Sequence, residues 1–244
     1  TTTNPIITKS YDLAGNYVPQ LRVVDDANAT SSTSADLLIE DGKKVSSAGQ
    51  SLQVKGRDYG TIADQGQIDF TNGKKLTVEF WVKPDAESDE DAWIIRQGGS
   101  KGNSKWGVEW TGTGDERQIT FKAGRFNDNI ASNTGVPAGV WTHVAIVYDG
   151  NNRIMYINGE VDKTRSGSDP PDNNANNRVR FGSNDPGNGR FFAGKIDNVR
   201  FWNTDRNLIE IENNQYVELD GTESGLDHLY QFNGDTTDGP GTDA

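Results

Sequence analysis

A group of asparagine, aspartate and arginine side chains near residues 166–190 has the residue types that could bind a metal ion or a sugar. Carboxylate and amide oxygens are ligands that Ca²⁺ takes, and the same groups can hydrogen-bond to saccharide hydroxyls. Asn and Asp are also common turn residues, so ordinary loop polarity is the alternative interpretation. The candidate ligand-binding residues are Asn184, Asp185, Asn188 and Arg190, with Asp169, Asp172 and Asn173 as further members of the group.

Aromatic side chains are a second candidate surface, because a flat ring can stack on the C–H face of a pyranose. Trp106 and Trp110 are four residues apart in an expected strand, so both face the same side of the sheet. Phe126 lies in a polar loop over 125–129. We therefore count Trp93, Trp106, Trp110 and Phe126 as candidate ligand contacts, with packing in the core as the alternative.

The sequence argues against an enzyme. Glycoside hydrolases need two carboxyl groups separated by about 5–5.5 Å or about 6.5–9.5 Å. The carboxylates within expected strands, Glu79, Glu109 and Asp197, are isolated in the sequence. There is no GxSxG or P-loop motif, the two histidines have no HExxH spacing, and cysteine is absent. No catalytic residue is predicted.

The charge of the chain limits its partners. A formal net charge of −12, from 36 acidic and 24 basic side chains, repels phosphate backbones and argues against nucleic acid. The same charge is compatible with cations and neutral glycans. No apolar run approaches the roughly 20 residues that cross a bilayer, so membrane insertion is not expected. The first residues, TTTNPII, suggest a processed product or an excised fragment.

The stretch WTHVAIVYDGNNRIMYINGE at 141–160 predicts a long β-hairpin. Its first strand is rich in β-branched and aromatic residues, and the return strand carries Ile154 and Tyr156. A turn is expected over 149–152, and Asn158 and Gly159 begin a second tight turn. A chain patterned in this way is expected to be an antiparallel β-protein.

Further strands separated by turn residues predict an all-β, two-sheet sandwich or jelly roll over residues 42–244. One helix is expected over 205–213 with Thr204 as its N-cap. The segments 85–91 and 166–177 are expected loops. The expected strands cover 51–54, 59–63, 76–83, 93–97, 106–110, 118–123, 178–182 and 196–202.

Residues 1–41 differ from the rest, with an expected strand over 17–24, a turn at 25–28 and a Ser/Thr-rich strand that ends at Ile39. The stretch AGNY, the alternation of Leu21 and Val23, and the pair Asp25-Asp26 resemble the C-terminal part of a polycystic-kidney-disease (PKD) type, Ig-like domain. Half a sandwich leaves an open edge and little core. Either the chain is cut inside the domain, or these strands dock on the rest of the chain, or another molecule completes them.

Five blocks in order resemble the laminin-G-like jelly-roll family of concanavalin-A-like sandwiches, to which pentraxins and legume lectins are related. The resemblance covers roughly residues 45–238. It implies a non-catalytic module that binds glycans, peptides or proteins, often with Ca²⁺. The blocks are SLQVKGRDYGTI, LTVEFWVKP, WTHVAIVYDG with MYINGE, FAGKIDNVRFWN, and GTESGLDHLYQFNGD.

The resemblance also implies a calcium site, because the aspartate of the GKIDN strand commonly binds Ca²⁺ in related sandwiches. This aspartate is Asp197. The alternative is that Asp197 caps a turn or pairs with Arg200. The other candidate ligands, which include backbone carbonyls beside glycine, are Asp58, Asp69, Gly194 and Asp235.

Together these observations lead us to expect a Ca²⁺-assisted recognition module, secreted or on the cell surface, within a bacterial adhesin or other multidomain protein. Its expected partner is a glycan, with a peptide or protein as the lesser possibility. The alternative is a structural or assembly role, in which the N-terminal strands pair with a neighbouring molecule.

Overall fold

The computed structural model describes residues 51–55, 57–61, 75–98, 104–123, 129–167, 179–183, 189–232 and 239–240, and the backbone of four strands between residues 15 and 39. The chain divides into two compact units, residues 1–43 and 44–244. In the first unit β1 (Gly15–Tyr17) pairs with β4 (Leu37–Ile39), and β2 (Gln20–Val24) pairs with β3 (Thr30–Ser34). The expected strand over 17–24 is therefore two strands.

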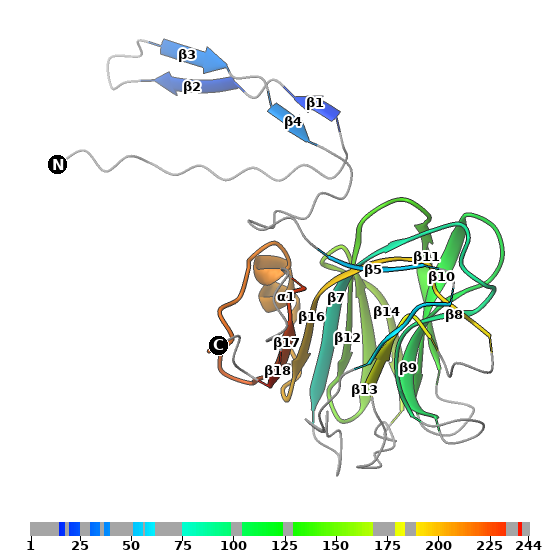
Figure 1. Ribbon diagram of the computed structural model, residues 1–244. Helices are drawn as coiled ribbons and strands as arrows, with labels where there is room; N and C mark the ends of the chain where they lie inside the picture. The colour runs from blue at the N-terminus through cyan, green and yellow to red at the C-terminus, as the bar shows by residue number, and fades with distance from the viewer. Residues whose placement is uncertain are drawn as a thin grey trace. The chain divides into compact units, whose positions relative to one another are not determined.

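The second unit is a sandwich of two antiparallel sheets, as predicted (Figure 1). The larger sheet has eight strands. Its order is β14 (Glu160–Ser166), β13 (Asn152–Ile157), β12 (Thr142–Tyr148), β7 (Leu76–Pro84), β16 (Gly194–Trp202), β17 (Leu226–Tyr230) and β18 (Gly239–Pro240), with β5 (Leu52–Val54) paired to β16.

The smaller sheet has six strands, and its solvent-side face carries the candidate site described below. The middle of this sheet is formed by β10, β9 and β8, which are consecutive in the chain. Its order is β11 (Ile130–Pro137), β10 (Glu116–Ala123), β9 (Ser104–Thr111), β8 (Ala92–Gly98), β15 (Val179–Phe181) and β6 (Gly60–Thr61).

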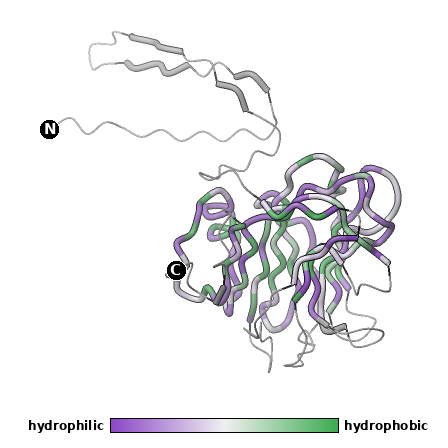
Figure 2. The backbone as a smooth tube through the Cα atoms, viewed as in Figure 1, coloured by the Kyte–Doolittle hydropathy of each residue, from purple (hydrophilic) through white to green (hydrophobic). Residues whose placement is uncertain are grey.

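The hydrophobic core lies between the two sheets. Alternate residues of β7, such as Val78, Phe80 and Val82, are fully buried and share one cluster with Trp106 and Phe121 of the opposite sheet. Figure 2 shows the hydrophobic residues concentrated along the strands of this unit. Each large apolar side chain removed from water in this way contributes about 1.5–3 kcal/mol, and this burial holds the sheets together.

The predicted hairpin is confirmed. β12 pairs with β13 through contacts such as Val147 with Ile154. Asn158 and Gly159 have φ values of 53° and 85°, the left-handed conformation of a tight two-residue turn, and β14 follows directly. Asp149 fixes the preceding turn, since one of its carboxylate oxygens accepts two backbone N–H groups at 2.7 Å.

The helix begins later than the sequence predicts. The helix α1 spans Leu208–Asn214, and its N-cap is Asn207 instead of Thr204. The Asn207 side chain accepts the N–H of Glu210, and the Glu210 carboxylate accepts the N–H of Asn207, which is a complete capping box. Ile211 then buries its side chain against Ala145, Val147 and Tyr156 on the outer face of the eight-stranded sheet.

A buried charged cluster on the same face holds the segment around α1 in place. Glu79 accepts the indole N–H of Trp202 at 2.7 Å, and the guanidinium groups of Arg200 and Arg206 lie 3.8 and 3.9 Å from the same oxygen. Arg200 also donates to the carbonyl oxygen of Asn214 at the end of α1. The cluster therefore has a structural role, and it occupies the sheet opposite to the candidate site.

Candidate functional site

Strand register brings a row of cationic side chains onto the outer face of the six-stranded sheet. Lys122 of β10 lies opposite Gly107 of β9, Gly107 lies opposite Arg96 of β8, and Arg96 lies opposite Arg180 of β15. Directly opposed residues of neighbouring strands point to the same face. We call Lys122, Arg96 and Arg180 the cation row.

A second row runs beside the first and consists of Thr120, Glu109 and Trp93, which are opposed in the same way. The Trp93 ring covers Gly107, since a Cβ atom added there would lie 2.3 Å from a ring carbon. Two members of the cation row flank this ring, with the Arg96 Cζ at 4.9 Å and the Lys122 Nζ at 5.5 Å from its centroid. Cations at these distances are attracted to the ring face.

Glu109 is the carboxylate of this face, and its side chain is 0% exposed. It forms ion pairs with Lys122 and with Arg190, whose Nη1 lies 3.2 Å from Oε1. Burial raises the pKa of Glu109, and the two cations oppose the rise by favouring the charged form. The cations that contact Glu109 are distant from it in the sequence, so sequence spacing did not reveal these ion pairs.

Arg190 reaches this face from the adjacent rim of the sandwich. It has a φ of 61°, its carbonyl oxygen accepts the N–H of Trp93 at 3.1 Å, and its side chain is 45% exposed. The next residue, Phe191, makes two hydrogen bonds to Asp89, both at 2.9 Å. The backbone N–H of Phe191 donates to the Asp89 carboxylate, and the backbone N–H of Asp89 donates to the carbonyl oxygen of Phe191. The loop 85–91 thus fixes the position of Arg190.

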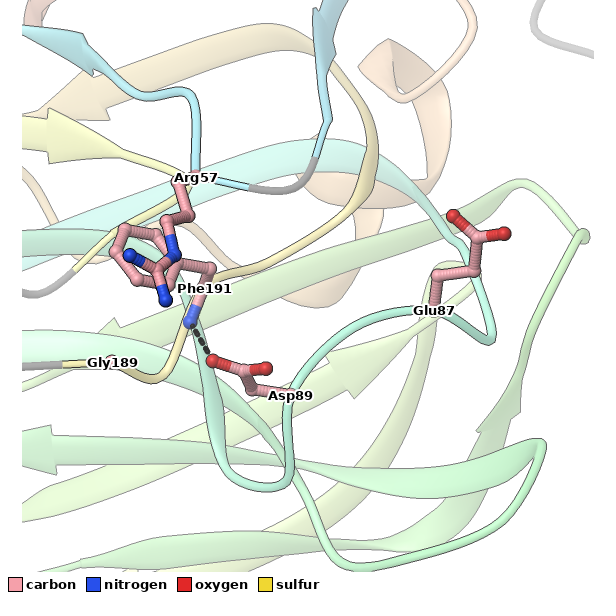
Figure 3. Close-up of a pocket in the computed structure, with 5 residues that line it drawn as sticks. All are labelled: Arg57, Glu87, Asp89, Gly189 and Phe191. Atoms are coloured by element: carbon pink, nitrogen blue, oxygen red, sulfur yellow. Dashed lines mark hydrogen bonds between the residues drawn. The ribbon is translucent and has the colours of Figure 1, made fainter.

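Beside Arg190 the rim holds a shallow pocket of about 280 Å³. The Arg57 guanidinium lies over the Phe191 ring, 5.9 Å from its centroid, and Figure 3 shows the Asp89 carboxylate directed at the backbone of Phe191. Glu87 points away from these groups in the same view. The pocket therefore combines one aromatic face with charges of both signs. Its lining residues are Arg57, Glu87, Asp89, Gly189 and Phe191.

Of the predicted loop ligands, the structure brings Arg190 to the site. Of the sheet-face cluster, Trp93 was a candidate. The sequence did not single out Lys122, Arg96, Arg180, Gly189 or Phe191, because only strand register and rim geometry bring them together. Several predicted residues lie outside the described part of the chain: Asn184, Asp185, Asn188, Asp169, Asp172, Asn173 and Phe126.

Two of the predicted tryptophans do not offer a surface to a ligand. Trp106 and Trp110 face the same side of β9, as expected, but that side is the core, and they are 1% and 0% exposed. Their indole N–H groups donate to Gln97 and to the Val136 carbonyl oxygen. This placement corrects the prediction of stacking, because hydrophobic packing and internal hydrogen bonds use both rings.

The expected calcium ligands are only partly described. Asp197 is buried, and its Oδ1 accepts the N–H of Asn198 at 2.7 Å, at a bulge of β16 where Asn198 has a φ of 46°. The Oδ1 of Asn198 is buried without a hydrogen-bond partner within the described residues. A buried carboxylate and an unpaired amide oxygen at one bulge are donors of the type that Ca²⁺ prefers. Arg200, the alternative partner of Asp197, is directed to Glu79.

The remaining candidates do not extend this donor set. Asp58 is exposed in the turn after β5, and Gly194 pairs with Val54 and Pro84 on the neighbouring strands. Asp69 and Asp235 lie outside the described residues. Across the ranges that the structure describes, no three Asp, Glu, His or Cys side chains converge as a metal-binding group.

The two antiparallel sheets, closed over one core and carrying a polar outer face, define a lectin-type β-sandwich. The sequence agrees, because a family model described as Concanavalin A-like lectin/glucanases superfamily matches residues 54–212, more than half of the chain. The chain belongs to this superfamily. The match begins after the N-terminal unit, so the resemblance of residues 1–41 to a PKD-type domain stays a prediction.

Solved structures agree on the fold. A Bacteroides ovatus protein provisionally classed as carbohydrate binding superposes with a TM-score of 0.60 at 16% identity, over 92% of this chain and 62% of its own length. A variant of the NanB sialidase from Streptococcus pneumoniae gives a TM-score of 0.50 at 19% identity, over 67% of this chain and 27% of its own. This chain therefore spans less than two thirds of each. No curated protein matches it in sequence.

The helix α1 has seven residues, and within the described parts of the chain no helix is long and apolar enough to cross a membrane.

Proposed function

We propose that this chain is a non-catalytic recognition module that binds a glycan where the rim pocket meets the outer face of the six-stranded sheet. We include in this proposal that the module acts outside the cell as part of a larger surface or secreted protein. The fold is that of carbohydrate-binding and lectin-like domains, which supports a binding role without identifying the ligand.

The position of Arg190 carries the proposal. It belongs to the segment that lines the rim pocket, and its guanidinium is ion-paired to the buried Glu109 on the sheet face. The carbonyl oxygen of Arg190 accepts the N–H of Trp93, and the backbone of the next residue, Phe191, is hydrogen-bonded to Asp89. A partly exposed cation held in this way loses little conformational freedom when it binds a ligand, and such preorganisation limits the cost that weakens sugar binding.

The distribution of carboxylates supports a non-catalytic role. Hydrolysis of a glycosidic bond requires two carboxyl groups on either side of the scissile bond. Glu109 lies on the outer face of the six-stranded sheet, whereas Glu79 and Asp197 belong to strands of the eight-stranded sheet. These strand carboxylates therefore do not form a pair at the proposed site. Of the pocket carboxylates, Asp89 accepts the backbone N–H of Phe191, and Glu87 points away from the other lining groups.

A glycan panel with matched variants tests the proposal. We expect the wild-type chain to bind at least one saccharide class, and Phe191→Ala and Arg57→Ala to weaken this binding about tenfold by removing the aromatic face and its cation. Lys163→Ala is the control, because Lys163 lies on β14 of the other sheet. Melting curves verify that the variants are folded. Absence of binding across a broad panel contradicts the proposal.

An assembly role is the second candidate. In the N-terminal unit the strands β2 and β3 form a two-stranded sheet, as do β1 and β4, and two-stranded sheets have unpaired edges that favour pairing with another chain. Sedimentation of the full chain tests this role. Self-association that rises with concentration supports it, and a strict monomer at high concentration contradicts it.

A further inference from the structure

We infer that the ligand of the sheet face is an acidic oligosaccharide, bound through carboxylate groups by Arg190, Lys122 and Arg180. This inference rests on the proposed function and specifies its ligand class. Neutral glycans are the partners that the overall charge of the chain favours, so the inference departs from what composition alone indicates.

The local charge has the opposite sign to that of the whole chain. The formal net charge is −12. Among the described residues of the two rows and Arg190, four side chains are cationic, and Glu109 is the anionic one. At the neighbouring pocket the Arg57 cation is accompanied by the carboxylates of Glu87 and Asp89, so the excess of positive charge belongs to the sheet face. A concentration of positive charge on an acidic protein attracts anions selectively to this face and repels them elsewhere. A neutral sugar gains no charge–charge attraction from this concentration of cations.

The exposure of these side chains suits a ligand that lies across the strands. Trp93 is 4% exposed, and with the buried Arg96 it forms the floor. Above the floor, Arg180 is half-buried, and Lys122 is 30% exposed. Lys122 and Arg180 stand on strands three positions apart, a span of roughly 14 Å at the usual strand spacing. This span exceeds what a single small anion bridges and fits an oligosaccharide.

The hydrogen-bonding groups of the face are donors. A guanidinium presents paired N–H groups that match the two oxygens of a carboxylate, and such charged bonds are stronger than neutral ones. The buried indole N–H of Trp93 has no acceptor within the described part of the chain. Glu109 is already engaged by Lys122 and Arg190. The cations above the floor and the unpaired indole N–H of the floor are complementary to an acceptor-rich ligand, and the carboxylate of a uronic or sialic acid meets this requirement.

Calorimetry with the full chain tests the inference. The probes are an oligogalacturonate, sialyllactose, dextran sulfate as the sulfated comparison without carboxylates, and two neutral sugars, lactose and a cello-oligosaccharide. We expect a carboxylated probe to bind at least tenfold more tightly than either neutral sugar. Comparison of the first two probes distinguishes a uronate from a sialate. Binding should weaken as salt is raised from 50 to 300 mM, because exposed charges are screened.

Arg180→Gln and Arg190→Gln should each weaken binding of the acidic probe about tenfold, and Arg180→Lys and Arg190→Lys should weaken it less, because lysine keeps the charge and loses the paired N–H groups. Lys163→Gln, on the other sheet, should have no effect. If a glutamine variant fails to fold, the salt dependence of binding by the wild-type chain still tests the inference.

Three results overturn the inference. Equal affinity for neutral and acidic sugars overturns it and leaves the proposed function standing. Binding of dextran sulfate without either carboxylated probe overturns the carboxylate assignment alone. No binding to any saccharide overturns both proposals.

Discussion

Arg190 Nη1 lies 3.2 Å from Glu109 Oε1, although 81 residues separate them in the chain. This ion pair joins the rim of the sandwich to the middle of a sheet face. Because Glu109 is fully buried, the interaction is less screened by water than a surface ion pair. The pair therefore places the exposed part of Arg190 in a defined position beside the pocket, and the proposed binding site depends on it.

Gly107 should be required for the floor of the site. A Cβ atom at this position would lie 2.3 Å from the Trp93 ring and 3.0 Å from the Ile95 carbonyl oxygen. We expect Gly107→Ala to destabilise the fold by about 1–3 kcal/mol through overpacking and to change the environment of Trp93. Thermal melting and near-UV circular dichroism measure the two effects.

Gly60→Ala is the matched control for this prediction. Gly60 is also a strand glycine, but its added Cβ would meet only ordinary contacts, the nearest at 3.5 Å. A Gly107→Ala variant as stable as Gly60→Ala would contradict the position of the Trp93 ring.

The fold was largely predictable from the sequence, because turn residues and alternation are local signals. Asn158 and Gly159 mark their turn by residue type alone. The strand β11 was missed, since its polar middle, ASNTG, lacks regular alternation and its pairing contains a register shift. The start of α1 was misplaced because the capping box needs the Asn207–Glu210 spacing to be weighed against the more common Thr204 signal.

The candidate site was mostly not predictable. Trp93, Lys122 and Arg190 belong to separate parts of the chain, and only the pairing of β8, β9 and β10 shows that their side chains share a face. Trp106 and Trp110 have the same residue type as Trp93, yet they face the core. A shift of one residue in register exchanges the two faces of a strand, so residue type alone cannot distinguish them.

His143 should make the folded state sensitive to acid. Burial, followed by the nearby charges of Arg200 and Arg206, lowers the pKa of His143 from 6.5 to about 3. The Glu79 carboxylate, 3.6 Å from His143 Nε2, also faces it. Between pH 6.5 and 3 the unfolded chain binds a proton at this histidine that the folded chain does not bind. The free energy of unfolding is therefore expected to fall by a few kcal/mol as pH decreases through this window.

Denaturant unfolding at a series of pH values measures this contribution. His143→Gln should be less stable at pH 7, because it loses the contact with Trp81 at 5.3 Å between ring centroids. Its free energy of unfolding should nevertheless depend less on pH than that of the wild type. Parallel pH profiles for the two chains would show that His143 does not contribute.

Asp162 should hold the edges of the two sheets together. Its carboxylate, on β14, accepts the backbone N–H groups of Asn133 and Thr134, on β11, at 2.6 and 2.9 Å. We expect Asp162→Ala to cost about 1–3 kcal/mol and to speed hydrogen exchange at these two amides. Glu160→Gln, at an exposed position of the same strand, is the control. Unchanged exchange at residues 133 and 134 would contradict the link.

Calcium should stabilise the chain if Asp197 and the unpaired Asn198 Oδ1 belong to a cation site. We expect EDTA to lower the melting temperature by several degrees and added Ca²⁺ to restore it, since a ligand that binds only the folded state stabilises it. Asp197→Ala should melt lower and no longer respond to either addition. Asp115→Ala, at an exposed position, should respond as the wild type does. A wild-type melting curve unaffected by EDTA would contradict a calcium site at Asp197 and Asn198.

The indole N–H of Trp93 offers the most direct test of recognition at the six-stranded sheet. In a ¹⁵N-labelled chain titrated with the tightest acidic oligosaccharide, the Trp93 Nε1 resonance should shift progressively to saturation. Trp81 lies on the other sheet, and its indole N–H donates to the Gln215 carbonyl oxygen at 2.8 Å. Its resonance should not move. A saturating titration that leaves Trp93 in place, or one that moves Trp81 instead, would contradict the proposed site.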